Sequence, residues 1–186
     1  MLKRLILIVG LPDSGKSTVA KFIKKEINAD IVCSGDIIRE EIKKRGLKYT
    51  PENDVLIADW FNKNGREKLL VKRVWDKIKK SKKKMIVIEG FTSDENIKNL
   101  EEISKIKPIV IAIISSFKVR VQRGIKRERF SEKESKKHIK FREKLEKNRG
   151  IEKLIGKADY KIDNSALSIR ETNVIVSKLL KEILVK

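Results

Sequence analysis

The apolar residues of this chain gather in five short runs that are rich in valine and isoleucine. Four of the runs are continuously apolar, which is typical of a strand buried on both faces of a sheet, and the last contains one lysine. Longer polar stretches with helical spacing separate the runs. This alternation predicts a parallel five-stranded sheet covered by helices on both faces, a three-layer α/β/α fold. The predicted strands are Leu5–Val9, Ile31–Cys33, Met85–Ile88, Ile109–Ile114 and Tyr160–Ile162, and a last helix spans about Leu167–Leu184.

Two stretches without a strand are long, and the first of them is too long for a single crossover helix. The first covers about residues 34–84, and within it Thr50 and Pro51 fit the cap and the first position of a helix. The second, about residues 117–157, is dense in charged side chains. We therefore expect one domain over residues 1–186, with a helical insertion in the first stretch and a mobile cover in the second.

The segment directly after the first predicted strand carries the clearest chemical signal. Its glycines let successive backbone N–H groups turn toward one anion, and the N-terminus of the following helix adds partial positive charge. The pattern predicts a phosphate loop for ATP, in which Lys16 reaches the β- and γ-phosphates and the Ser17 hydroxyl binds Mg²⁺. The segment fits G-x-x-x-x-G-K-[ST] at every fixed position and, with the next residue, consists of Gly10, Leu11, Pro12, Asp13, Ser14, Gly15, Lys16, Ser17 and Thr18.

A second polar segment follows the second predicted strand. Ser34 and Gly35 come directly after Cys33, and we expect a helix to begin at Asp36, with Arg39 one turn later. Ligands of open α/β sheets bind beyond the carboxyl ends of the strands, so this segment faces the same crevice as the phosphate loop. The third predicted strand also ends in a carboxylate and a glycine, Glu89-Gly90.

These segments resemble the nucleoside monophosphate kinases, adenylate kinase especially, whose second strand ends in a similar STGDMLR segment. The resemblance extends in order along nearly the whole chain, toward the adenylate-kinase-related and dephospho-CoA-kinase-like P-loop proteins of archaea. It implies that Ser34 and Gly35 line an acceptor site and that Arg39 clamps the acceptor phosphate. A planar guanidinium suits such bidentate recognition better than lysine does.

The resemblance also assigns roles at the end of the third strand. Glu89 would contact Mg²⁺ through a water molecule or would orient the acceptor, and Gly90 would lie beside it. The chain then departs from the family, because Thr92 and Ser93 stand where adenylate kinase has Pro-Arg. An arginine for the acceptor phosphate is thereby lost, which argues against a standard AMP kinase.

Arginines cluster in the second long stretch, although lysine is far more common in the chain. Arg120, Arg123 and Arg127 are three and four residues apart and share one helix face, and Arg129 and Arg142 follow. The resemblance places this stretch at an arginine-rich lid that stabilises the charge of the transferred phosphoryl group. Arg123 and Arg127 are then the first candidates for donor-phosphate contacts, and Arg142 the next. A solvated cationic helix is the alternative.

The net charge is +20, from 46 basic and 26 acidic residues. Either a polyanionic partner such as RNA or a lysine-rich compositional bias would explain it. We favour bias combined with a small anionic substrate, because the lysines are scattered along helices and aromatic residues are rare. The apolar runs are too short to span a membrane, and a single cysteine, Cys33, fits the reducing cytoplasm. The sequence leaves the oligomeric state open.

The combined signals predict an ATP-dependent phosphotransferase that moves the γ-phosphoryl group of Mg-ATP to a nucleotide-like acceptor. The acceptor would be a nucleoside monophosphate similar to AMP or a molecule similar to dephospho-CoA. A phosphate acceptor is already a nucleophile, whereas a hydroxyl acceptor needs a base, for which Asp36 is the candidate. The alternative is a P-loop ATPase that acts as a switch on RNA or ribosomal particles.

Overall fold

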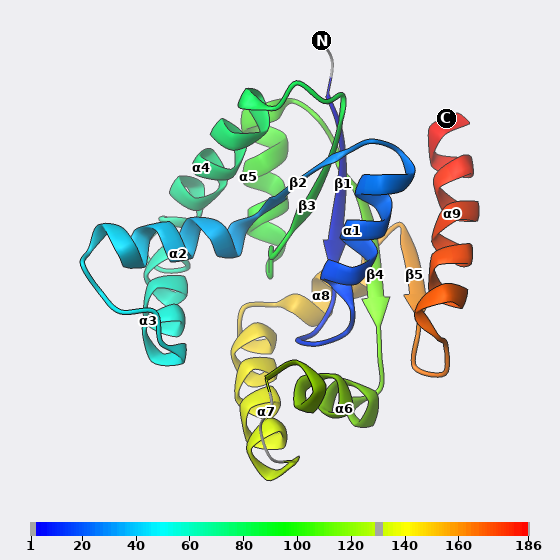
Figure 1. Cartoon of the computed structure of the whole chain (residues 1–186). Helices are drawn as coiled ribbons and strands as arrows, with labels where there is room; N and C mark the ends of the chain where they lie inside the picture. The colour runs from blue at the N-terminus through cyan, green and yellow to red at the C-terminus, as the bar shows by residue number, and fades with distance from the viewer. Residues whose placement is uncertain (1–2, 129–131, 186) are drawn as a thin grey trace.

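The computed structural model describes residues 3–128 and 132–185, and its centre is a five-stranded parallel sheet (Figure 1). The strand order is β2-β3-β1-β4-β5, and every neighbouring pair is parallel. All five predicted strands are confirmed to within about one residue at each end. Their bounds are β1 Arg4–Val9, β2 Asp30–Cys33, β3 Met85–Glu89, β4 Ile109–Ile114 and β5 Tyr160–Asp163.

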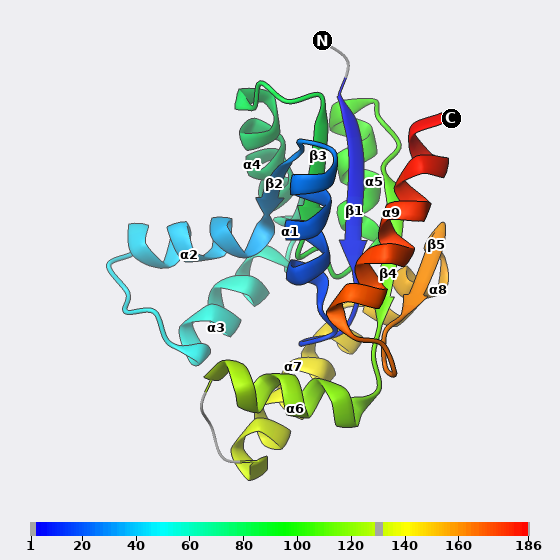
Figure 2. The same cartoon turned by 45° about the vertical axis from the view of Figure 1, so that its right-hand side comes forward.

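Helices cover both faces of the sheet, which confirms the three-layer architecture (Figure 2). Alternate residues of β1 point to opposite faces, so Leu5 and Leu7 enter one apolar core while Ile6 and Ile8 enter the other. Helices α1 (Lys16–Glu26) and α9 (Ile169–Val185) pack on the Ile6 side. The Leu5 side is covered by α4 (Glu67–Lys80), α5 (Asp94–Ser104) and α8 (Ile151–Gly156).

The first long stretch between strands forms α2 (Ser34–Lys44), α3 (Pro51–Phe61) and α4. The first two of these project beyond the β2 edge of the sheet (Figure 1). The predicted start of α3 is confirmed, because the Thr50 hydroxyl accepts a hydrogen bond from the Asn53 amide at 3.2 Å. The predicted start of α2 at Asp36 is wrong. Cys33 keeps an extended backbone and the helix begins at once with Ser34, which puts the Asp36 carboxylate in the first turn, near the positive end of the helix dipole.

The second long stretch forms α6 (Phe117–Glu128), α7 (Glu132–Asn148) and α8. Helices α6 and α7 lie beyond the carboxyl ends of the strands, below the arrowheads in Figure 1. An ion pair between Arg149, just after α7, and Asp59 of α3 joins the two long stretches. No helix within residues 3–128 or 132–185 is long and apolar enough to cross a membrane.

Candidate functional site

The site lies at the carboxyl end of β1, the central strand. The chain places β2 and β3 on one side of β1 and then β4 and β5 on the other. Such a change of direction leaves a crevice at the carboxyl edge of the sheet, where ligands of this architecture bind. The predicted phosphate loop leaves β1 at this point and leads directly into α1.

Two glycines give the loop its path. Gly10 has a φ of 149°, and a Cβ atom there would lie 2.3 Å from the Ile113 carbonyl oxygen of β4. Gly15 is left-handed, with a φ of 100°, and forms the N-cap of α1. A larger residue at position 10 would push β4 away, and Gly15 turns the chain so that the first amides of α1 open into the crevice.

The loop is fastened to the far half of the sheet through one carbonyl group. The Ser14 oxygen accepts hydrogen bonds from Arg123 Nη1 at 2.9 Å, Ser115 Oγ at 3.1 Å and Asn164 Nδ2 at 3.1 Å. Ser115 follows β4 and Asn164 follows β5, so both strand ends hold the loop in place. The Ser14 hydroxyl is buried and has no hydrogen-bond partner among the described residues, as expected of a group inside an anion site.

Lys16 is folded back over the loop that it belongs to. Its Nζ atom donates to the carbonyl oxygens of Gly10 at 2.6 Å and Leu11 at 2.9 Å. Burial is the main cause that lowers the pKa of the Lys16 ammonium from its ordinary value. The Glu146 carboxylate of α7 is the strongest of the charges that oppose this shift, while Arg142 adds to it. A phosphate group would compensate the buried ammonium better than carbonyl dipoles do.

Ser17 and Glu89 form the part of the site that fits a metal ion. The Ser17 hydroxyl donates to Glu89 Oε2 at 3.0 Å, which links the loop to the last residue of β3. No group of three or more metal-ligating side chains exists in the described parts of the chain. One hydroxyl and one carboxylate still fit Mg²⁺, since this ion keeps several waters and takes further oxygens from substrate phosphates.

The predicted acceptor segment follows β2, the edge strand beside β3. Ser34 is buried, and Gly90, with a φ of 98°, approaches so closely that a Cβ on it would lie 2.3 Å from the Ser34 hydroxyl oxygen. Gly35 leaves room beside it for the Arg39 guanidinium, 3.4 Å from where its own Cβ would be. Asp36 and Arg39 form an ion pair with each other, and both side chains are about half exposed.

The predicted arginines fall into different environments. The Arg120 side chain is only 3% exposed, and its three nitrogens donate to the Ser115 and Pro12 carbonyls and to Glu143 Oε2. Three of its five N–H groups are thus engaged within the protein, and this buried arginine supports the loop. Arg142 lies in α7 and pairs with Glu146 at 3.8 Å. Arg127 lies in α6 with its side chain outside the described part, and Arg129 is outside the described residues altogether.

Arg123 borders a pocket of about 150 Å³ beside the phosphate loop. Its Nη1 also donates to Ser115 Oγ at 2.8 Å and to Asn164 Oδ1 at 3.1 Å, and burial lowers its pKa from the ordinary arginine value. The pocket runs between α1, α6 and the start of α9. Its walls are Asp13, Gly15, Thr18, Val19, Arg123, Asn164, Ile169, Thr172 and Asn173.

Sequence reasoning missed several residues that build this site. Glu146 belongs to a lysine-rich helix pattern, and nothing in that pattern distinguishes it from the other acidic residues of α7. Ser115 and Asn164 are the first residues after β4 and β5, and this position at the carboxyl edge is a signal that could have identified them. Asn173 stands in the second turn of a helix, and only the fold brings it to the pocket.

Comparison with known proteins places this geometry in a family. A family model described as AAA domain matches residues 9–140. A UPF0200 protein of Pyrococcus abyssi is 33% identical, covering 95% of this chain and 97% of that protein. A UPF0200 protein of Methanococcus vannielii is 35% identical, covering 87% of this chain and 86% of that protein.

Solved structures share the fold at low sequence identity. A shikimate kinase from Acinetobacter baumannii, solved in complex with shikimate, superposes with a TM-score of 0.57 at 18% identity. The match covers 98% of this chain and 93% of the shikimate kinase. TT1252 from Thermus thermophilus gives a TM-score of 0.62 at 17% identity, covering 100% of this chain and 98% of that one. The fold is therefore that of P-loop kinases.

Proposed function

Because the chain belongs to the AAA-domain family and to the UPF0200 proteins of archaea, with a P-loop kinase-like fold, we propose that it is an ATP-dependent phosphotransferase. It moves the γ-phosphoryl group of Mg-ATP to a small, nucleotide-like acceptor. The donor phosphates lie in the loop of residues 10–17, and the nucleoside lies toward the pocket beside Arg123 and Asn164.

The observation that carries this proposal is the contact between Ser17 and Glu89. Glu89 stands opposite Ile8 of β1 on one side and opposite Cys33 of β2 on the other. The phosphate loop and the Ser34–Arg39 segment therefore leave two strands that flank the same carboxylate. This arrangement holds a donor phosphate and an acceptor on either side of the Glu89 carboxylate, as direct transfer of a phosphoryl group requires.

The residues of the chain act by positioning and by neutralising charge. Lys16 exchanges its loop carbonyls for the β- and γ-phosphate oxygens, and the Ser14 hydroxyl and the first amides of α1 donate to the same oxygens. Ser17 and Glu89 would hold Mg²⁺, which would offset part of the phosphate charge. Arg123 and Arg142, from the helices beyond the strand ends, face the donor phosphates, with Arg127 on the same helix as Arg123.

The acceptor carries a phosphate that the Arg39 guanidinium recognises. Asp36 holds this guanidinium in place through their ion pair, and Ser34, Gly35 and Gly90 shape the floor of the acceptor site. Both a nucleoside monophosphate similar to AMP and a molecule similar to dephospho-CoA meet this description. The loss of an arginine at Thr92 and Ser93 favours an acceptor other than that of a standard adenylate kinase.

An acceptor panel tests the proposal. The protein is incubated with Mg-ATP and, separately, with AMP, GMP, CMP, UMP or dephospho-CoA, and the products are identified by mass. We expect one acceptor to gain a phosphoryl group and the Lys16→Ala variant, folded as judged by its melting curve, to give none. The exposed neighbour Lys21 provides the matched control, since Lys21→Ala keeps the loop intact. ADP and free phosphate with every acceptor unchanged would instead indicate an ATPase.

A further inference from the structure

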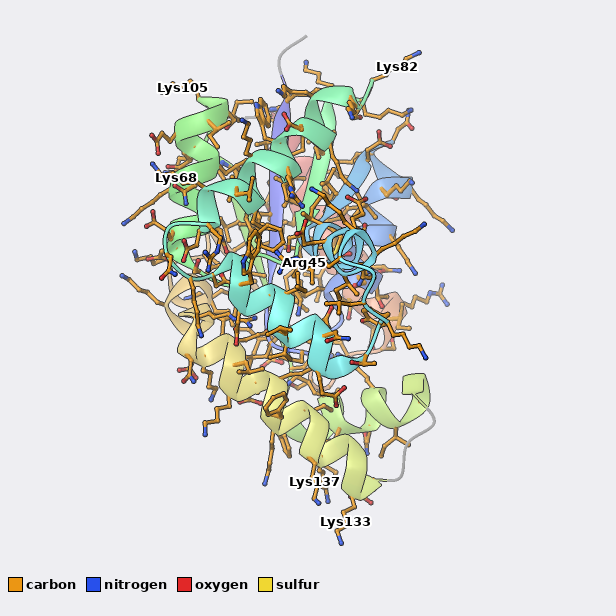
Figure 3. All side chains as sticks on the ribbon, turned by 90° about the vertical axis from the view of Figure 1, so that its left-hand side faces the viewer. Arg45, Lys68, Lys82, Lys105, Lys133 and Lys137 are labelled. Carbon is orange, nitrogen blue, oxygen red and sulfur yellow. The ribbon has the colours of Figure 1, made fainter. Side chains whose placement is uncertain are left out.

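Lysines extend into solvent from several parts of the molecule, so positive charge alone does not mark where the base of a nucleotide binds. Figure 3 shows Lys68 of α4, Lys105 after α5, and Lys133 and Lys137 of α7 in one view. A base is an uncharged, flat ring that is recognised by apolar contacts and by hydrogen bonds along its edge. A pocket with apolar walls and an unpaired polar atom is therefore the feature that indicates a base site.

The pocket of about 150 Å³ beside the phosphate loop has the place and the size for a base. It shares Gly15 with the loop and Thr18 and Val19 with α1, so a nucleotide whose phosphates lie in the loop can reach it with its base. Pockets that enclose a whole drug-sized ligand start at about 300 Å³. The smaller volume of this pocket suits one ring system, with the ribose and the phosphates outside.

The first two turns of α9 form one wall of this pocket. Ile169 and Asn173 are four residues apart and share one face of the helix. Ile169 is 65% exposed, although covering a large apolar side chain is favourable. Val19 of α1 adds a buried apolar side chain to the lining. A flat ring in the pocket would cover Ile169 and bring its polar edge near the Asn173 amide.

Asn173 carries an unpaired polar atom on this wall. Its Oδ1 atom is buried and has no hydrogen-bond partner in the described part of the chain. Other polar groups of the pocket are paired: the Thr172 hydroxyl donates to the Ser168 carbonyl at 2.9 Å, and Asn164 Nδ2 donates to the Ser14 carbonyl at 3.1 Å. A buried amide oxygen without a donor is unfavourable. A ligand that donates a hydrogen bond to Asn173 would complete the site.

An asparagine amide matches one edge of adenine, because its oxygen accepts from the N6 amino group while its nitrogen donates to N7. The last torsion of an asparagine side chain is broad and two-fold, so the amide can turn its oxygen toward a ligand in the pocket. We infer that Asn173 is the specificity-determining residue that selects adenine as the base of the donor nucleotide. Guanine has a carbonyl oxygen where adenine has its amino group, and on that edge it leaves the amide oxygen unpaired. The inference rests on the proposed function, to which it adds the residue that recognises the base of the donor.

Isothermal titration calorimetry with Mg²⁺ and one diphosphate at a time tests the inference. The ligands are ADP, GDP and purine riboside diphosphate, which is ADP without the amino group. The wild type should bind ADP at least about tenfold more tightly than either of the others, because both leave the amide oxygen unpaired. Asn173→Leu, which has a similar size and no polar atom, should bind ADP about tenfold less tightly than the wild type does. Its affinity for purine riboside diphosphate should stay within about threefold of the wild-type value.

Val174→Leu is the matched control, since Val174 is the next residue of α9 and is 51% exposed. This variant should keep the preference for ADP. The melting temperatures of both variants show whether α9 remains folded.

Equal binding of ADP and purine riboside diphosphate by the wild type would overturn the inference without any variant. An Asn173→Leu variant that binds both ligands more weakly by the same factor would also overturn it, since that result indicates a structural role for Asn173. Either result leaves phosphate binding in the loop intact. Failure of all three diphosphates to bind would overturn the proposed function as well.

Discussion

At the scale of single residues, the buried arginines contribute to the site by holding the phosphate loop in place. Arg120 satisfies all three of its nitrogens with loop, strand-end and α7 oxygens. Arg123 shares the Ser14 carbonyl with Ser115 and Asn164. A preorganised loop needs no rearrangement when charge develops during phosphoryl transfer, which is where electrostatic catalysis gains most. Arginines that support the loop are thus as much part of the site as those that contact a ligand.

Arg39 gives the first prediction at this scale. Arg39→Ala should raise the KM for the acceptor by about ten- to a hundredfold, because hydrogen bonds to a charged partner contribute about 1.5–3 kcal/mol. The KM for ATP should change little, since Arg39 lies beyond β2, on the acceptor side of Glu89. Steady-state kinetics with each substrate varied in turn measures both values. An equal rise of the two constants would remove Arg39 from the acceptor site.

Asp36 gives a second prediction. Its carboxylate is engaged with the Arg39 guanidinium, so we expect Asp36→Asn to act mainly on the acceptor KM, through a less well held arginine. The turnover number should fall less than about tenfold, well below the scale of lost general-base catalysis. A loss of kcat of about a hundredfold or more would contradict this and identify Asp36 as the base for a hydroxyl acceptor.

At the scale of elements, a buried charge network holds the helices of the first long stretch together. Glu41 of α2 is 5% exposed and accepts from Arg45 Nε at 2.8 Å and from Arg73 Nη1 of α4 at 2.7 Å. The same guanidinium of Arg45 stacks over the Trp60 ring of α3, 4.2 Å from its centroid. One carboxylate therefore fixes three helices relative to each other, and with them the acceptor segment at the start of α2.

Glu41→Gln should destabilise the protein by about 2–3 kcal/mol at neutral pH, because a buried charge-assisted pair loses its anion. Burial alone would raise the pKa of Glu41, but the hydrogen bonds and charges of Arg73 and Arg45 outweigh it and hold that pKa below its ordinary value. A lowered carboxyl pKa stabilises the folded state above the unfolded pKa of about 4.3, and this contribution is lost as pH falls through the folded value.

Urea unfolding at several pH values measures this prediction. The gap between wild type and Glu41→Gln should be largest near neutrality and should close in acid. Glu40→Gln is the matched control, since Glu40 is an exposed neighbour whose one ion pair among the described residues is with the partly exposed Lys77. A gap that stays constant down to acid pH, or a control that loses as much stability, would show that the network is not what fastens the helices.

The elements also show what sequence patterns can predict. All five strands were predictable, because continuous β-branched runs between polar stretches have few alternative structures in a chain of this kind. The cap at Thr50 was predictable from local chemistry alone. The start of α2 was not, because Ser34 and Gly35 suit a loop by propensity, whereas the helix begins with Ser34 directly after the extended Cys33.

The candidate site was predictable where its residues lie close together in the sequence. It was not predictable where the fold brings distant residues together. The loop of residues 10–17 can be recognised from the sequence alone, because few other structures require this spacing of glycine, lysine and serine. Glu146, Ser115 and Asn173 come to the site from two helices and one strand end, and no spacing rule connects residues so far apart in the sequence. The pairing of Ser17 with Glu89 was within reach because the loop pattern assigned a Mg²⁺ role to Ser17 and the resemblance assigned one to Glu89.

At the scale of the whole molecule, the two long stretches between strands carry most of the net positive charge. Residues 34–84 contain sixteen basic and eight acidic side chains, and residues 117–157 contain sixteen basic and six acidic ones. Helices α6 and α7 of the second stretch lie beyond the carboxyl ends of the strands (Figure 1), where we propose that the anionic donor and acceptor bind. An excess of positive charge there would raise the local concentration of anionic substrates.

The measurement that tests the central claim most directly follows the γ-phosphoryl group itself. ATP whose γ-phosphoryl oxygens carry a heavy isotope is mixed with excess protein, Mg²⁺ and the acceptor found in the panel, and the products of a single turnover are weighed. The account predicts that the label appears in the acceptor, and that with Lys16→Ala it stays in ATP. Label that appears only in inorganic phosphate, with the acceptor unlabelled, would contradict direct transfer and make the protein an ATPase.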